Sequence, residues 1–101
     1  MNLILTAIFS LFLIISCPNP ELFEYIRSHE TNENLSFLKS TGNQENYDTA
    51  LIISIFLERK ELADKLIKNG ANINFIEQGQ SPLFTAISLK SFEMAKFLIE
   101  K

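Results

Sequence analysis

Apolar residues recur at intervals of three and four along most of the chain beyond residue 20. Residues 49–69 read TALIISIFLERKELADKLIKN, and residues 81–101 read SPLFTAISLKSFEMAKFLIEK. In each segment a polar break, Glu58-Arg59-Lys60 or Lys90-Ser91, separates two apolar runs. Because this spacing places apolar side chains on one face of a helix, each segment is predicted to form two short amphipathic helices.

The two segments are copies of one another. Shifted by 32 residues without a gap, they are identical at seven of 21 positions, namely Leu51/Leu83, Ile55/Ile87, Leu57/Leu89, Glu61/Glu93, Ala63/Ala95, Leu66/Leu98 and Ile67/Ile99. Similarity at a fixed period of this length is the signature of a repeat architecture, in which neighbouring units bury one another.

The ends of the helices carry recognisable signals. Thr49 and Ser81 are predicted to cap the first helix of each copy with their hydroxyls. Pro82 then occupies a first-turn position, where its missing N–H has no consequence. Gly70 is predicted to end the second helix of the first copy in a left-handed conformation.

These motifs resemble ankyrin repeats. The family pattern Thr-Pro-Leu-His-x-Ala corresponds to residues 81–86, SPLFTA, and its Gly-Ala-Asp-Val-Asn corresponds to residues 70–74, GANIN. The Leu-Glu-Val-Val-x-Leu-Leu type of helix corresponds to residues 92–99, FEMAKFLI. The resemblance is clear over residues 46–101, and it implies a β-hairpin finger between residues 70 and 81, with Ile73 packed beneath it.

Two departures from the family pattern are predicted to affect stability. Ile52 and Phe84 replace the family histidine, so the hydrogen bond that ties the first turn is lost. Glu58 and Lys90 stand where the family has a glycine with positive φ, which is unfavourable for residues with a side chain. The array is therefore expected to be less stable than a consensus array.

Residues 19–45 form a weaker copy, with Leu22, Phe23 and Ile26 on one helical face and a second helix ending near Gly42. We predict an atypical capping repeat at 21–45, a repeat at 46–78 and a repeat truncated at its C-terminus at 79–101. The predicted fold class is all-α, an ankyrin-repeat solenoid of two to three helix-turn-helix repeats with short β-hairpin or loop fingers. The finger before Thr49 is expected to be stunted.

The first sixteen residues differ from the rest because they contain no charged side chain. Their apolar stretch, residues 3–15, is too short for a comfortable membrane span but has the length of a signal-peptide core. Residues 1–16 are predicted to be an export signal. An uncleaved anchor and a buried hydrophobic helix are the alternatives.

The end of this segment, Ile14-Ile15-Ser16-Cys17, resembles the lipobox of bacterial lipoproteins. The resemblance implies cleavage before Cys17, its acylation and a membrane anchor, with residues 17–20 as lipidated cysteine and tether. The alternative is that Cys17 merely lies near an ordinary cleavage site. The expected location is a membrane-anchored lipoprotein on the periplasmic face or cell surface, or else a soluble secreted or periplasmic protein.

The composition excludes several classes of function. The chain has a formal net charge of −3, so nucleic acid is not expected as a partner. One histidine and one cysteine cannot build a metal site or a Cys–His pair. His29 is expected to be a solvated surface imidazole. We predict no enzymatic activity, no metal, no cofactor and no small-molecule substrate.

The remaining class is recognition of another protein. In the ankyrin family, contacts come from finger tips and from the exposed ends of the first helices. Carried over to this chain, the predicted partner-binding residues are Phe56, Phe75, Ile76, Glu77, Gln78, Gln80 and Ser88. Whether Phe56, Phe75 and Ile76 are exposed or buried by a twist of the repeats is left open. The principal hypothesis is a membrane-tethered adaptor or modulator.

The alternative is a scaffold lipoprotein that self-associates through the face of its last repeat, with Met94, Phe97 and Leu98 exposed there.

Overall fold

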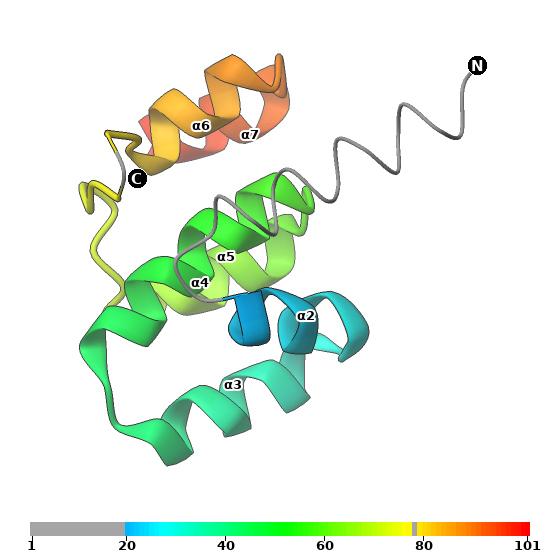
Figure 1. Cartoon of the computed structure of the whole chain (residues 1–101). Helices are drawn as coiled ribbons and strands as arrows, with labels where there is room; N and C mark the ends of the chain where they lie inside the picture. The colour runs from blue at the N-terminus through cyan, green and yellow to red at the C-terminus, as the bar shows by residue number, and fades with distance from the viewer. Residues whose placement is uncertain (1–19, 78) are drawn as a thin grey trace.

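The computed structural model describes residues 20–77 and 79–101, and within these residues it contains six α-helices. Figure 1 shows them as three stacked helix pairs, with the α4–α5 pair between the other two. Their bounds are α2 Pro20–Ser28, α3 Thr31–Thr41, α4 Gln44–Phe56, α5 Lys60–Lys68, α6 Pro82–Ser88 and α7 Phe92–Ile99. The all-α repeat fold predicted from the sequence is confirmed.

The first helices of the three pairs form one layer. Helix α4 packs against α2 on one side and α6 on the other, and α3 and α5 contact each other in the second layer. Because α4 has neighbours all round, every residue from Asp48 to Ile55 is buried. Each fully buried aliphatic side chain contributes about 1.5–3 kcal/mol relative to an exposed one, so this helix dominates the core.

Small side chains occupy buried positions that recur in both copies. Ser54, Ala63 and Ala86 have no exposed surface, and Ala95 is buried as well. Their small volumes allow the backbones to approach closely, which explains the recurrence of small residues at these positions in both copies.

The start of α4 differs from the prediction. Thr49 does not cap this helix, because α4 begins five residues earlier, at Gln44. The Asn43 side chain accepts a hydrogen bond of 2.9 Å from the Glu45 amide and caps the helix there. Only Gly42 and Asn43 separate α3 from α4, so the expected stunted finger is absent and its residues form the first turns of α4.

The start of α6 and the end of α5 agree with the prediction. The Ser81 hydroxyl accepts a hydrogen bond of 3.1 Å from the Phe84 amide, and Pro82 opens the helix. After α5, Gly70 has φ +102°. The amides of Gly70 and Ala71 donate to the carbonyls of Ile67 and Leu66, which is a Schellman cap.

The same cap ends α4 and α6 without a glycine. Glu58 and Lys90 have φ values of 55° and 57°, as predicted from their places in the repeat. The residues after them, Arg59 and Ser91, donate their amides to the carbonyls of Ser54 and Ala86. A left-handed conformation costs roughly 1–2 kcal/mol for a residue with a side chain, so both turns carry backbone strain.

The last helix pair buries three apolar side chains that were predicted to be exposed. Met94, Phe97 and Leu98 are buried, so the prediction that they form an exposed terminal face is wrong. They face the core, and the Phe97 ring also lies 5.5 Å from the Lys60 ammonium of α5. Lys101 adds an ion pair of 2.8 Å to Asp64, also on α5. Polar and cation–π contacts therefore join the second helices of these two repeats.

Polar contacts at the end of α2 hold the first helix pair together and join it to the second. Asn34 is fully buried, and its side-chain amide lies 3.2 Å from the His29 carbonyl and 3.4 Å from that of Ile26. The Arg59 guanidinium, at the start of α5, also donates to the Ile26 carbonyl. This cation satisfies a terminal carbonyl of α2 and ties the capping repeat to its neighbour.

We expect Glu58→Gly and Lys90→Gly each to raise the free energy of unfolding by about 0.5–1 kcal/mol. Glycine removes the strain of positive φ, although it also gains freedom in the unfolded chain. Chemical denaturation would measure the change. The matched controls, Glu58→Ala and Lys90→Ala, remove the side chain but keep the strain and should give no comparable gain. Equal gains from alanine and glycine would contradict the interpretation.

Candidate binding surface

The segment between α5 and α6 forms the finger of the array, defined here as residues 71–80. Its first turn is closed by the Asn72 side chain, which accepts a hydrogen bond of 2.9 Å from the Asn74 amide. Its tip is closed by reciprocal backbone hydrogen bonds of 3.0 Å between Glu77 and Gln80. The predicted β-hairpin is thus reduced to one isolated bridge, followed along the chain by α6.

The base of the finger is held by Asp48 of α4. The Asp48 carboxylate accepts hydrogen bonds from the Asn72 amide at 2.7 Å and from the Gln44 side chain at 2.9 Å. The same Gln44 amide group donates to the Gly70 carbonyl at 2.9 Å. Early helical residues of α4 therefore fix the point where the chain leaves α5.

The tip of the finger is held by the next residue of α4. The buried Thr49 hydroxyl donates a hydrogen bond of 2.7 Å to the Glu77 carboxylate. Between base and tip, Ile73 packs against the core, which agrees with its predicted place beneath the finger. The finger is therefore attached to α4 at two points by side chains that are adjacent in sequence.

The predicted contact residues occupy different environments. Ile76 is 66 % exposed and is the single large apolar side chain that is exposed on the described part of the finger. Phe75, Glu77 and Gln80 are partly buried, and Glu77 and Gln80 also form the bridge. Gln78 lies outside the described residues. Partner binding by these residues remains a prediction.

The two predicted helix positions, Phe56 and Ser88, differ in exposure. Phe56 is partly buried against the core, which supports the packing alternative left open by the sequence. Ser88 is exposed. Phe56 lies seven residues beyond Thr49, the α4 residue that holds the finger tip, which is about 10 Å along a helix axis. On α6, the Thr85 hydroxyl lies 3.3 Å from the Gln80 side-chain oxygen, so Ser88 is only three residues beyond a residue that contacts the finger.

The sequence reasoning missed the other exposed apolar side chains. They are Phe84 at 53 %, Ile87 at 52 %, Phe92 at 70 % and Ile99 at 70 %, all in the last helix pair. Their equivalents in the preceding copy are Ile52, Ile55, Lys60 and Ile67. Comparing each position of the last helix pair with the position 32 residues earlier would have identified them.

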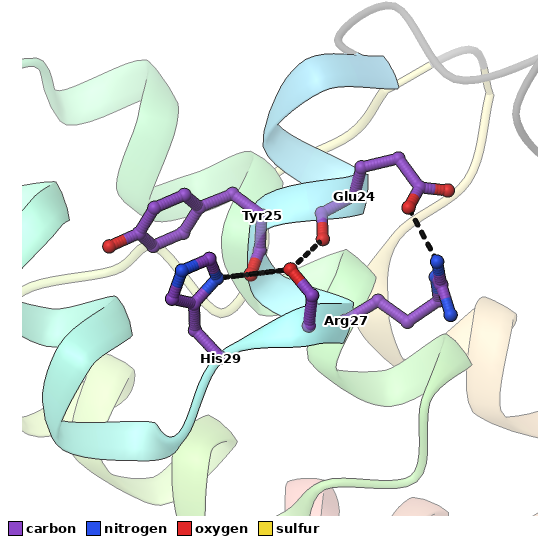
Figure 2. Close-up of polar contacts among 5 residues, drawn as sticks. Glu24, Tyr25, Arg27 and His29 are labelled. Atoms are coloured by element: carbon purple, nitrogen blue, oxygen red, sulfur yellow. Dashed lines mark hydrogen bonds and ion pairs between the residues drawn. The ribbon is translucent and has the colours of Figure 1, made fainter.

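His29 is packed rather than freely solvated, which corrects the prediction. Figure 2 shows its ring against that of Tyr25, with centroids 3.8 Å apart and planes 8° from parallel. Its Nδ1 lies 2.8 Å from the Tyr25 carbonyl oxygen, which can only accept, so Nδ1–H donates. Phe37 stacks on Tyr25 as well, with centroids 4.2 Å apart. The imidazole thus serves packing between α2 and α3.

The charged side chains of α2 and α5 form solvated pairs. The Arg27 guanidinium donates a hydrogen bond of 2.6 Å to the Glu24 carboxylate (Figure 2), and this hydrogen bond raises the pKa of the guanidinium. On α5, Glu61 pairs with Lys65 at 3.5 Å and Asp64 pairs with Lys68 at 3.0 Å. Hydrogen bonds from Lys101 and Lys68 lower the pKa of the Asp64 carboxyl.

Within residues 20–77 and 79–101, no group of three or more histidine, cysteine or acidic side chains is placed to hold a metal ion. Over the same residues, none of the helices has the length and apolar character needed to cross a bilayer. The predicted leader and Cys17 lie outside the described residues, and their roles remain predictions.

Comparison with protein families gives a match to ankyrin repeats in three copies, over residues 11–101. The chain therefore belongs to the ankyrin-repeat family. Repeats of this family form protein–protein interaction modules. The match covers the weak first copy and begins inside the predicted leader, residues 1–16. Comparisons with curated proteins and with solved structures give no match.

We expect Asp48→Ala to release the base of the finger and to lower the free energy of unfolding by about 2 kcal/mol, because two hydrogen bonds to a carboxylate are lost. Hydrogen exchange at the Asn72 amide, which donates to Asp48, should accelerate strongly. Glu45→Ala, an exposed acidic residue of the same helix, is the control and should stay within about 0.5 kcal/mol of the wild type. Unchanged exchange at Asn72 in Asp48→Ala would contradict the anchoring role.

Proposed function

We propose that this chain is a non-catalytic adaptor that binds another protein through its finger and is held at a membrane by acylated Cys17. The observation that carries the binding part is the finger itself: residues 71–80 are fastened to α4 at both base and tip, yet Ile76 at the tip is 66 % exposed.

The anchoring of the finger supports a binding role on energetic grounds. Ordering a mobile loop on association costs free energy and weakens a complex. Hydrogen bonds from Thr49 and to Asp48 order this finger before any partner arrives. An apolar side chain presented on such a rigid support is the kind of group that forms an interface hot spot.

Around Ile76 the finger carries few charges. Glu77 is its one ionisable side chain, and its carboxylate is engaged by Thr49. A weakly charged tip with an apolar centre suits an apolar pocket or groove on a protein partner better than nucleic acid, which requires basic side chains. No small-molecule substrate is part of the proposal, because the fold by itself carries no reaction.

To test the binding surface, a photo-crosslinking amino acid is placed at position 76 and, as a control, at exposed Lys39 on α3. We expect a protein that is captured from position 76 and not from position 39. Ile76→Asp should then weaken binding of that purified protein by at least about tenfold, whereas Lys39→Asp should not. Equal capture from both positions, or unchanged affinity in Ile76→Asp, would reject the finger as the binding surface.

The membrane tether rests on the uncharged leader and the lipobox-like residues 14–17. Several acyl chains on one cysteine give stable anchoring, whereas one chain binds weakly and reversibly.

The intact mass of the protein from the membrane fraction tests the tether. We expect the mass of residues 17–101 plus acyl groups, and Cys17→Ser should leave a full-length, unacylated chain. An unmodified full-length mass for the wild type would rule out the tether while leaving the binding proposal in place.

A further inference from the structure

The sequence contains a single Asn-Gly pair, Asn69-Gly70, at the junction between α5 and the finger. An asparagine can lose its side-chain amide when the backbone nitrogen of the next residue attacks its side-chain carbonyl carbon, and glycine hinders this attack least because it has no side chain. Both residues are exposed, and nothing crowds Gly70 where a side chain would begin. The two asparagines of the finger are instead followed by isoleucine and phenylalanine, which are bulky.

The structure holds this pair in a geometry that does not react. Cyclisation forms a five-membered ring, in which the Gly70 nitrogen must eclipse the Asn69 Cβ about the Cα–C bond. At the Asn69 ψ of 11° the Gly70 nitrogen instead eclipses the backbone nitrogen of Asn69 itself. The Gly70 amide also donates a hydrogen bond of 3.1 Å to the Ile67 carbonyl, and the Asn69 side-chain amide donates one of 2.6 Å to the Lys65 carbonyl. The attacking nitrogen and the leaving amide group are therefore both held by the last turn of α5.

Deamidation therefore requires the C-terminal cap of α5 to open. Rotation about the Asn69 Cα–C bond displaces the Gly70 amide and also the Ala71 amide, which donates to the Leu66 carbonyl at 2.9 Å. It also moves the Gly70 carbonyl, which accepts a hydrogen bond of 2.9 Å from the Gln44 side chain. Because helix ends open locally more often than the whole domain unfolds, the rate of reaction follows the population of the open cap.

The reaction changes both the charge and the length of the backbone at this junction. The Gly70 nitrogen bonds to the Asn69 Cγ, the Cγ–Nδ2 bond breaks, and ammonia leaves with the proton of the Gly70 amide. Water then opens the resulting succinimide at either of its carbonyl carbons, which gives aspartate or isoaspartate. In isoaspartate the backbone runs through Cβ, so the chain gains a methylene group immediately before Gly70.

Either product weakens the cap of α5. A carboxylate cannot donate the hydrogen bond that the Asn69 side-chain amide gives to the Lys65 carbonyl. Its negative charge also lies at the C-terminal end of the helix, which is the negative end of the helix dipole. The cations of the last turn, Lys65 and Lys68, already pair with Glu61 and Asp64.

We propose that Asn69 is a deamidation site controlled by the C-terminal cap of α5, and that its conversion to aspartate or isoaspartate loosens the base of the finger. The Asn72 amide, which donates to the Asp48 carboxylate at 2.7 Å, lies three residues beyond the modified position. The reaction consumes only water, so its extent records the age of the molecule and how often this cap has opened. The proposal does not depend on what the finger binds.

The reaction is tested by ageing the full chain in an uncharged detergent and a mildly alkaline buffer, with and without guanidinium chloride. Cleavage at lysine releases peptide 69–90, in which mass spectrometry locates the product and chromatography separates aspartate from isoaspartate. We expect the product at Asn69 and not at Asn72 or Asn74, formed at least about tenfold more slowly in the folded chain. No product at Asn69 in guanidinium chloride, or equal rates in the folded and unfolded chain, overturns the proposal.

Control by the cap is tested with Gln44→Ala, which removes the hydrogen bond to the Gly70 carbonyl. This variant should accelerate the folded-state reaction at least about threefold, whereas Glu45→Ala, a change at its exposed neighbour, should not. Equal acceleration in both variants would contradict control by the cap. Circular dichroism melting checks that each variant remains folded.

The effect on the finger is measured by hydrogen exchange at the Asn72 amide, in the aged protein and in Asn69→Asp, which supplies the charge of the product directly. We expect exchange at least about threefold faster in both. Asn74→Asp is the matched control, because it places the same charge on an exposed asparagine of the finger, and it should leave exchange at Asn72 unchanged. Unchanged exchange in both the aged protein and Asn69→Asp would overturn the proposed effect on the finger.

Discussion

The structure depends on the burial of α4 between α2 and α6. A short amphipathic helix pair cannot cover its own apolar surface, so each pair is stable only when its neighbours cover it. Helix α4 shows the full extent of this constraint, because all residues from Asp48 to Ile55 are buried. The neighbouring helices then have to lie close on both sides, which explains why Ala50, Ser54 and Ala86 are small.

The same helix positions the candidate binding surface. Its buried run begins with Asp48 and Thr49, two polar residues whose side chains leave the core to hold the base and tip of the finger. Burial of a carboxylate and a hydroxyl is tolerated here because both are hydrogen-bonded. Core packing and the placement of Ile76 are therefore coupled through a single turn of α4. The finger needs little regular structure of its own, since these side chains supply most of its support.

The two ends of the array, which have a neighbouring helix pair on one side only, expose different kinds of side chain. At one end, α2 and α3 present polar side chains to solvent, and Arg59 and Asn34 satisfy carbonyl groups at the end of α2. At the other, α6 and α7 keep the apolar pattern of an internal repeat, so Phe84 and Ile87 are exposed where Ile52 and Ile55 are covered. The two ends therefore differ in chemistry, with a polar surface on α2 and α3 and exposed apolar side chains on α6 and α7.

The sequence by itself determined the repeat, its helix pairs, the caps at Ser81 and Gly70 and the strained turns at Glu58 and Lys90. These are local features, because hydroxyl capping, positive φ and helical spacing depend on residues within a few positions of each other. Only the tertiary structure decided that α4 begins at Gln44, that Thr49 holds the finger and that Phe97 is buried while Phe84 and Ile87 are exposed. Those outcomes depend on which helix lies beside which, and apolar residues at the same repeat position differ in exposure solely because their neighbours differ.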